Sequence, residues 1–186
     1  MEDRVSAAFD ATPRAGFLPR AARLRARFDG PIQIGRGQTN SQPRTVAAML
    51  RLLEVREGDR VLDVGSGSGW TTALLAQLTG PFGEVVGVEL EPTLVQFGRR
   101  NLARTGRPWA RIEQAVPGRL GWPDGAPYDR ILVSAEPRHL PQQLVDQLAG
   151  DGRMVIPVSG TMLLVVRTPM GTEVTEHGGY RFVPLR

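Results

Sequence analysis

The chain has 186 residues, a formal net charge of +4 and no cysteine. Its length fits one folded domain, and 41% hydrophobic with 23% charged residues is typical of a globular protein. The lack of cysteine excludes disulfides, catalytic thiolates and cysteine-based zinc sites. No apolar run reaches the roughly 18 residues of a membrane helix, and residues 1–16 lack the apolar core of a signal peptide. We therefore expect a cytoplasmic protein with no membrane partner.

All 23 basic residues are arginines, so a catalytic lysine is impossible. This exclusive usage favours a bias in genomic base composition, and the alternative is an arginine surface for nucleic acid. The densest cluster has no aromatic residues interleaved to stack on bases, so a nucleic-acid partner is not favoured. That cluster consists of Arg20, Arg23, Arg25 and Arg27.

Residues 1–44 are rich in glycine, proline and arginine and lack clear periodicity, whereas helices and strands alternate from residue 45 onward. Proline at position 92 suits a first helical turn, and short apolar runs ending in glycine or a charge suit buried strands. In chain order we expect a helix at 45–55, a strand at 60–65, a helix at 71–78, a strand at 84–89, a helix at 92–105, strands at 110–114 and 128–134, a helix at 140–148, a turn at 150–152, and strands at 153–158, 163–168 and 180–185.

This alternation predicts an α/β fold with an open, mostly parallel sheet and helices on both faces. Such sheets bind ligands beyond the carboxyl ends of their strands. We expect a single domain spanning 1–186, in which 45–186 form the α/β core with its C-terminal strands. Residues 1–44 are expected to form an arm over the ligand-binding edge.

The strongest chemical signal is a glycine-rich loop between a predicted strand and a predicted helix, Asp63-Val64-Gly65-Ser66-Gly67-Ser68-Gly69-Trp70. A dinucleotide fingerprint would need a third glycine at Trp70, and a phosphate-binding P-loop would need a lysine. The G-x-G-x-G pattern after an acidic residue is instead similar to the first motif of class I S-adenosylmethionine-dependent methyltransferases, which are Rossmann-like. In those enzymes the acidic position, here Asp63, lies near the methionine end of the cofactor. The alternative is a plain glycine-rich turn.

Glu89 closes the next predicted strand, 20 residues after Gly69 (89 − 69). A carboxylate at this offset can accept both hydroxyls of a ribose. An ordinary glutamate at a strand end is the alternative. Because the loop and Glu89 are independent features, their combination predicts a nucleoside-binding site.

Several colinear segments resemble the protein-L-isoaspartate O-methyltransferase family over roughly residues 3–186. The run Gly37-Gln38-Thr39-Asn40-Ser41-Gln42-Pro43 is similar to the family signature G-Q-T-[IV]-S-[QA]-P. Further similar segments are Thr12-Pro13-Arg14 with Phe17-Leu18-Pro19, YDRILVSA at 128–135, Leu140-Pro141 with Leu144, GRMVIPV at 152–158 and RFVPL at 181–185.

The resemblance implies transfer of a methyl group from S-adenosyl-L-methionine to the free α-carboxyl of L-isoaspartyl residues in damaged proteins or peptides. It implies that Ser41 is the active-site serine and that residues 181–185 lie by the peptide cleft. The implied cofactor contacts are Thr39, Asn40, Ser41, Asp63, Val64, Gly65, Ser66, Gly67, Glu89 and Leu90. No metal is implied.

This chemistry needs few catalytic groups. A carboxylic acid with a pKa of about 3–4 is already ionised at neutral pH and can attack a sulfonium methyl without a general base. Ser41 is then expected to orient the carboxylate or the cofactor. The two histidines, His139 and His177, are expected to be solvated. The scarcity of His, Lys and Cys argues against hydrolases that use activated nucleophiles.

Three departures from the family pattern keep alternatives open. Asn40 replaces the apolar residue of the signature, and Val116-Pro117-Gly118 replaces a G-D-G whose aspartate meets the adenine amino group. The sequence also begins close to Arg4, later than the helix with which the family usually starts. One alternative is a carboxyl methyltransferase of the same fold for a different, dedicated peptide. Another is a non-catalytic RNA-binding module.

Overall fold

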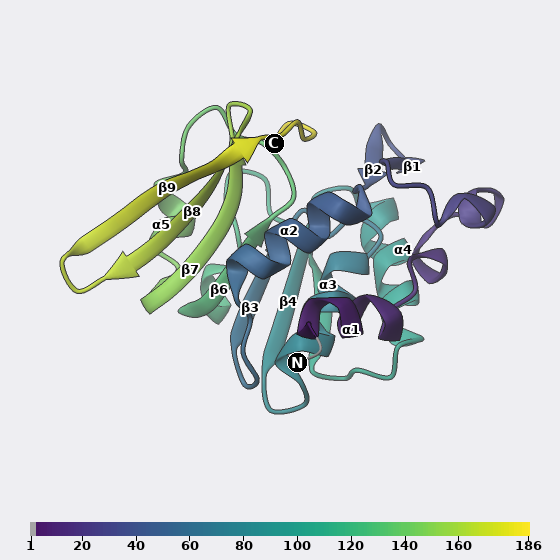
Figure 1. Ribbon diagram of the computed structural model, residues 1–186, viewed down its shortest axis with the longest axis horizontal. Helices are drawn as coiled ribbons and strands as arrows, with labels where there is room; N and C mark the ends of the chain where they lie inside the picture. The colour runs from purple at the N-terminus through teal and green to yellow at the C-terminus, as the bar shows by residue number, and fades with distance from the viewer. Residues whose placement is uncertain (1–2) are drawn as a thin grey trace.

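Seven strands form one open sheet in the order β5-β4-β3-β6-β7-β8-β9 (Figure 1). The structure is a computed structural model that describes residues 3–186. The five strands from β5 to β7 run parallel, and β8 and β9 continue the sheet antiparallel. Their bounds are β3 Arg60–Val64, β4 Glu84–Glu89, β5 Ala110–Gln114, β6 Tyr128–Val133, β7 Leu148–Val158, β8 Thr161–Thr168 and β9 Gly171–Gly179. A separate hairpin pairs β1 Ile32–Gly35 with β2 Gln38–Asn40.

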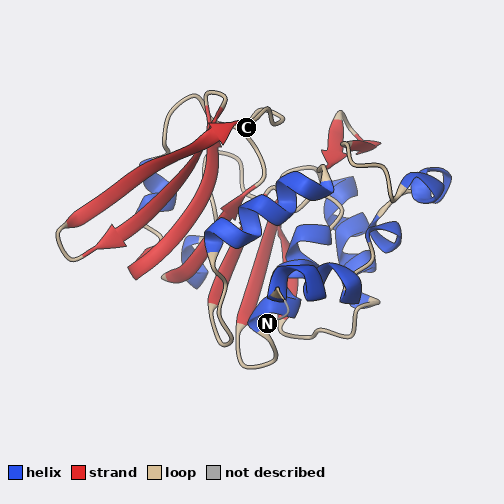
Figure 2. Cartoon of the chain, in the orientation of Figure 1, coloured by secondary structure: helices blue, strands red, loops and turns tan. Residues whose placement is uncertain are grey.

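Helices cover both faces of this sheet (Figure 2). One face carries α1 (Arg4–Ala11), α2 (Pro43–Leu53) and α3 (Trp70–Thr79), whose apolar residues share a core with Val61, Val85 and Leu132. The opposite face carries the short α5 (Gln142–Val145) and the loop 115–127. Because β3, β4 and β6 are covered on both faces, they are nearly continuous apolar runs, as the sequence pattern predicted.

The strand order reverses between β3 and β6. From β3 the chain proceeds outward through β4, α4 (Pro92–Ala103) and β5, and then returns to place β6 on the other side of β3. The connections that follow the carboxyl ends of β3 and β6 therefore leave in opposite directions, one toward β4 and the other toward β7. A ligand crevice is expected at this switch point.

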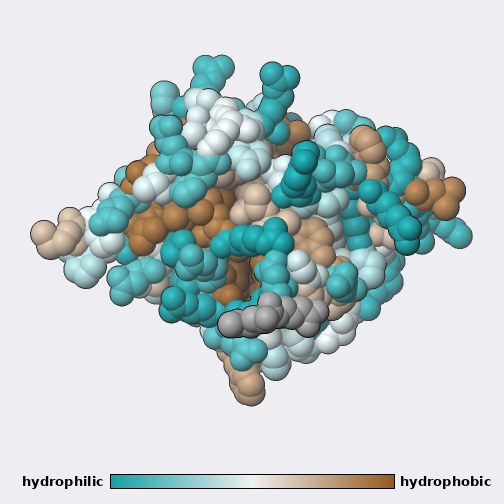
Figure 3. Space-filling view, in the orientation of Figure 1, coloured by the Kyte–Doolittle hydropathy of each residue, from teal (hydrophilic) through white to brown (hydrophobic). Residues whose placement is uncertain are grey.

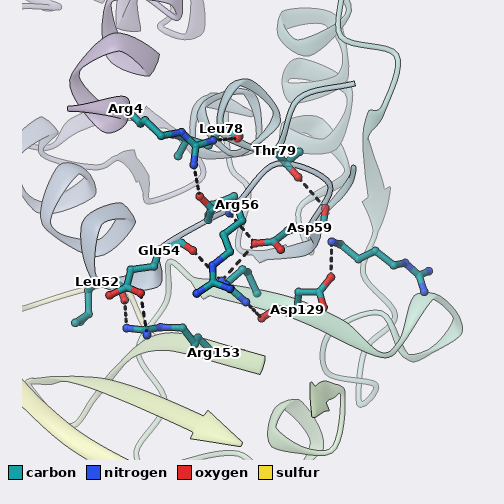
Figure 4. Close-up of polar contacts among 12 residues, drawn as sticks. Arg4, Leu52, Glu54, Arg56, Asp59, Leu78, Thr79, Asp129 and Arg153 are labelled. Atoms are coloured by element: carbon teal, nitrogen blue, oxygen red, sulfur yellow. Dashed lines mark hydrogen bonds and ion pairs between the residues drawn. The ribbon is translucent and has the colours of Figure 1, made fainter. Parts of the chain in front are cut away.

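Around the amino ends of β3 and β6, arginine side chains bind backbone carbonyls and carboxylates (Figure 4). Arg130, only 5% exposed, lies 3.4 Å from an Asp59 carboxylate oxygen and donates to the Glu54 carbonyl at 3.1 Å. Arg4 donates to the carbonyl of Leu78 at 2.6 Å and so satisfies the C-terminal end of α3.

Two features of the N-terminal and central chain differ from the sequence prediction. Residues 4–11, expected within an irregular arm, form α1, which packs on α2 and α3. The helix expected at 140–148 is limited to α5, because Pro141 begins it and the chain enters β7 at Leu148.

The C-terminal region differs as well. The turn expected at 150–152 lies inside β7, where the register with β6 shifts and Asp151 has a φ of 61°. Strand β9 was missed because all of its side chains are exposed. Residues 180–185 form no strand: an isolated bridge pairs Pro184 with Glu136 after β6, and the Tyr180 amide donates to the Gly160 carbonyl at 2.8 Å.

The face that carries α1 and α2 is largely hydrophilic, with apolar side chains gathered beside α2 over β7 and β8 (Figure 3). Leu52 of α2 and Leu164 of β8 are only partly buried there. Within residues 3–186, no helix combines the length and apolar character needed to cross a membrane.

Candidate functional site

A cavity of about 580 Å³ opens at the carboxyl ends of β3, β4 and β6, at the switch point of the sheet. Segments distant in sequence form its walls: residues 38–41, the glycine-rich loop, the ends of β4 and β6, the loop after β5, the start of α5 and residues 183–186. All of the predicted cofactor residues line this cavity except Asp63. The structure thus brings together two motifs that lie more than twenty residues apart in sequence, the Ser41 loop and the glycine-rich loop.

The glycine-rich loop presents bare backbone to the cavity. Gly65, Gly67 and Gly69 have φ angles of 81°, 52° and 82°, a left-handed region that side chains disfavour. A Cβ on Gly69 would lie 3.0 Å from the carbonyl oxygen of Gly98 in α4, so the loop also packs too closely for a larger residue. The plain-turn alternative does not explain why Gly65, Ser66 and Gly67 all line the same cavity.

Glu89 lies at the cavity end of β4 with its side chain aimed at the glycine-rich loop. One carboxylate oxygen accepts from the Gly67 amide and the other from the Glu91 amide, each at 2.9 Å. A carboxylate oxygen can accept more than one hydrogen bond, so both oxygens retain capacity for hydroxyl donors. The residue is 8% exposed and lines the cavity, which suits a partner of ribose.

Asp63 is placed behind the loop. Strand alternation turns its side chain toward α3, where one oxygen accepts from the Thr71 and Thr72 hydroxyls at 2.7 and 2.6 Å. Burial, with a smaller contribution from the charge of Glu89, raises the pKa of Asp63 to about 6. Since Asp63 is 0% exposed and does not line the cavity, its carboxylate supports the start of α3. Its cofactor contact stays a prediction.

The Ser41 loop (residues 38–41) lies beside the glycine-rich loop, and both line the cavity. Thr39, Asn40 and Ser41 all line it, with Ser41 half-buried. Asn40 is 4% exposed: its amide nitrogen donates to the Ser68 hydroxyl at 3.0 Å and its oxygen accepts from Arg14 at 2.6 Å. Asn40 is therefore engaged with the protein at both polar ends, which removes the reason to link this departure to a different acceptor.

The Val116-Pro117-Gly118 segment forms a type II turn. The Arg119 amide donates to the Val116 carbonyl at 3.0 Å, and Gly118 has a φ of 81°. Val116 and Gly118 line the cavity, whereas Pro117 does not. Proline suits the second position of such a turn, where its missing N–H is not needed.

Sequence reasoning missed several cavity residues. Gln142 and Gln143 of α5 line the cavity, and the only sequence signal for them was the family-like segment Leu140-Pro141 with Leu144 around them. Glu136 follows β6 and, without lining the cavity, links the β7–β8 turn to the C-terminal segment: its carboxylate accepts from the Gly160 amide at 2.9 Å and the Phe182 amide at 3.1 Å. The resemblance at 181–185 indicated the C-terminal segment, and residues 183–186 do line the cavity.

Charge at the cavity rim is paired. Arg119 bonds Asp124, and Arg186 lies 3.1 Å from a Glu91 carboxylate oxygen across the rim. The lining includes no histidine. The site thus offers hydrogen-bonding groups and bare backbone rather than an activated nucleophile, an arrangement suited to aligning two bound partners.

An open sheet with a switch-point cavity, a G-x-G-x-G loop and an acidic residue at the end of the next strand defines a class I S-adenosylmethionine-dependent methyltransferase. A structure described as a protein-L-isoaspartate O-methyltransferase from Plasmodium falciparum in complex with S-adenosyl-L-homocysteine matches with a TM-score of 0.85 at 27% identity, covering 100% of this chain and 91% of that one. Another solved protein-L-isoaspartate O-methyltransferase matches with a TM-score of 0.87 at 25% identity; this chain spans 62% of its length.

The family model for protein-L-isoaspartate(D-aspartate) O-methyltransferase matches residues 1–186. A protein-L-isoaspartate O-methyltransferase of Methanopyrus kandleri is 44% identical over 98% of this chain and 83% of its own. One from Archaeoglobus fulgidus is 40% identical over 100% and 86%. The chain belongs to the protein-L-isoaspartate O-methyltransferase family, which confirms the resemblance in the sequence.

Proposed function

We propose that this protein transfers a methyl group from S-adenosyl-L-methionine to the α-carboxyl of L-isoaspartyl residues in damaged proteins or peptides. The observation that carries the proposal is that two separate loops line one cavity. The glycine-rich loop with Glu89 forms one wall, and the Ser41 loop forms another. Membership of the family supports the choice of acceptor.

The residues present fit the cofactor. Gly65 and Gly67 leave backbone accessible, and Glu89 offers acceptors for ribose hydroxyls. Leu90 adds an apolar surface beside Glu89. When bound, S-adenosylmethionine supplies a methyl group activated on a sulfonium.

The protein's own part in the reaction is alignment. The acceptor carboxylate is ionised at neutral pH, so no residue has to remove its proton. Ser41, which lines the cavity, donates a hydrogen bond that orients the carboxylate for in-line attack. Alignment of this kind can reach effective molarities on the order of 10⁵ M or more.

Two further expectations belong to this proposal. Residues 1–186 act as one domain, in which residues 38–41 at the end of the N-terminal segment reach the cavity while α1 packs on the helical layer. The protein works in the cytoplasm, an expectation supported by its lack of cysteine.

The test is incorporation of labelled methyl from S-adenosylmethionine into a peptide that contains one L-isoaspartyl residue. We expect base-labile incorporation, typical of a methyl ester, and inhibition by S-adenosylhomocysteine. Binding of S-adenosylhomocysteine in calorimetry without incorporation would leave a methyltransferase with a different acceptor. No binding at all would contradict the proposal.

A further inference from the structure

The guanidinium of Arg14 is buried directly beside the Ser41 loop. Arg14 is the first residue of the short 3₁₀ helix η1 (Arg14–Phe17) that follows α1, and it is 6% exposed. It donates to the Asn40 side-chain oxygen at 2.6 Å and to backbone carbonyls of four residues. Those carbonyls belong to Phe28 at 2.8 Å, Gly30 at 2.8 Å, Asn40 at 3.0 Å and Ser41 at 2.8 Å.

No carboxylate is among these partners. Burial lowers the pKa of Arg14 to about 10, and the negative charge of Asp29 acts on it only at longer range. The group therefore stays charged at neutral pH while it is held by carbonyl oxygens, a costly arrangement unless the partners are well placed. The planar fork of arginine can serve several such acceptors together, which lysine cannot do.

The same side chain is connected to the glycine-rich loop. Its guanidinium carbon lies 5.5 Å from the centre of the Trp70 ring at the start of α3, within cation–π range. Trp70 in turn donates to the Thr12 carbonyl at 3.0 Å. Asn40 completes a second connection through its 3.0 Å bond to Ser68. Arg14 thus contacts both walls of the cavity without lining the cavity itself.

Building on the proposed function, we propose that Arg14, acting through Asn40 and the Ser41 carbonyl, is a positioning residue for methyl transfer. It fixes the Ser41 loop relative to the glycine-rich loop, so that cofactor bound at the glycine-rich loop also orders the backbone of the Ser41 loop. The hydroxyl of Ser41 depends on its backbone for its place, and Arg14 holds that backbone at the carbonyl of the same residue. Small displacements of an aligning group can cost about a hundred-fold in rate.

The test compares Arg14→Lys and Asn40→Leu with the wild type and with Arg20→Lys. Arg20 is an exposed arginine in the same segment and lies outside the cavity, so its replacement is the matched control. Asn40→Leu leaves the bonds from Arg14 to backbone carbonyls in place and is expected to fold even if Arg14→Lys does not. Melting temperature, S-adenosylhomocysteine affinity, and kcat and KM for an isoaspartyl peptide are measured, with kinetics well below every melting midpoint.

We expect kcat to fall roughly ten-fold or more in both variants and to stay unchanged in the control. Arg14→Lys alters no residue of the cavity lining and should change S-adenosylhomocysteine affinity little, whereas Asn40 lines the cavity and its replacement is judged by kcat at saturating cofactor. The double variant should cost less than the product of the single effects, because both residues act on one loop. A lower melting temperature with an unchanged kcat would show a purely structural role and overturn the proposal.

A second readout does not depend on the acceptor. In the wild type, S-adenosylhomocysteine should increase hydrogen-exchange protection of the Asn40 and Ser41 amides, and this increase should be lost in Arg14→Lys or Asn40→Leu. If the wild type fails to methylate isoaspartyl peptide but shows the coupling, the proposed function fails and the positioning role stands. An equal increase in wild type and variants would refute the positioning role whatever the acceptor.

Discussion

At the scale of single residues, the two carboxylates near the glycine-rich loop have different environments. Glu89 faces the cavity, and each of its carboxylate oxygens accepts a hydrogen bond from a backbone amide. Asp63 is enclosed behind the loop, where one oxygen has two hydroxyl donors and the other has no partner among residues 3–186. Burial thus separates a cavity-facing acceptor from a supporting one, which the sequence could not distinguish because both lie at the carboxyl ends of apolar strands.

Glu89→Gln should weaken cofactor binding by roughly ten-fold or more. The change replaces one acceptor with a donor, at a position where the Gly67 and Glu91 amides already donate. Hydrogen bonds to charged groups contribute about 1.5–3 kcal/mol. Calorimetric titration with S-adenosylhomocysteine measures the effect, and unchanged affinity would remove Glu89 from the cofactor site.

Asp63→Asn should remove a pH dependence of stability. Because the folded-state pKa of Asp63 is raised to about 6, its contribution to stability is full below the unfolded pKa of about 4 and is lost as pH rises through about 6. The variant should therefore gain about 1 kcal/mol of unfolding free energy relative to wild type between pH 5 and pH 7.5. Denaturant titrations at the two pH values measure this difference; a constant difference would mean that Asp63 is ionised throughout.

Ser41→Ala should reduce turnover and leave folding nearly intact. The side chain is half-buried on the cavity wall, and substitutions of this kind usually change stability by no more than about 0.5 kcal/mol. Loss of one orienting hydrogen bond should lower methyl transfer by roughly one to two orders of magnitude. Thermal melts and labelled-methyl transfer are measured on the same samples. Full activity would exclude Ser41 from the mechanism, and a large drop in melting temperature would make it a structural residue.

At the scale of elements, the buried parallel strands could be predicted, while the elements at the edges could not. Residues 60–64, 84–89 and 128–133 are apolar because helices cover both faces of the sheet. Strand β9 has the sequence GTEVTEHGG, whose side chains are all exposed and carry no apolar alternation. Residues 180–185 are apolar enough to suggest a strand, yet they bind Glu136 and the cavity rim instead.

Glu136→Ala should loosen the C-terminal segment at the cavity. The carboxylate holds the amides of Gly160 and Phe182, while two backbone bonds between Glu136 and residues 183 and 185 remain in the variant. We expect faster amide exchange at Phe182 and a higher KM for peptide, with cofactor affinity unchanged. Equal exchange in both proteins would show that the backbone bonds alone fix this segment.

At the scale of the whole molecule, the class of protein followed from two short motifs because the sheet topology brings their ends together. Gly65–Gly69 and Glu89 end adjacent parallel strands, so their proximity was predictable. The Ser41 loop was placed at the cavity only by resemblance, since a glycine- and asparagine-containing loop has no periodicity to locate it. Arg14 stood out in the sequence only as part of the family-like segment at 12–14, because the burial on which its proposed positioning role rests is visible only in the structure.

The most direct test of the account is a comparison of two peptides that differ only in containing L-isoaspartate or normal L-aspartate. Initial rates of methyl transfer from S-adenosylmethionine are measured for both peptides with the wild-type protein under the same conditions. A cavity that orients the α-carboxyl of an isoaspartyl residue should give a kcat/KM for the isoaspartyl peptide at least about a hundred-fold above that of its twin. Equal values, or a preference for the normal aspartyl peptide, would contradict the account.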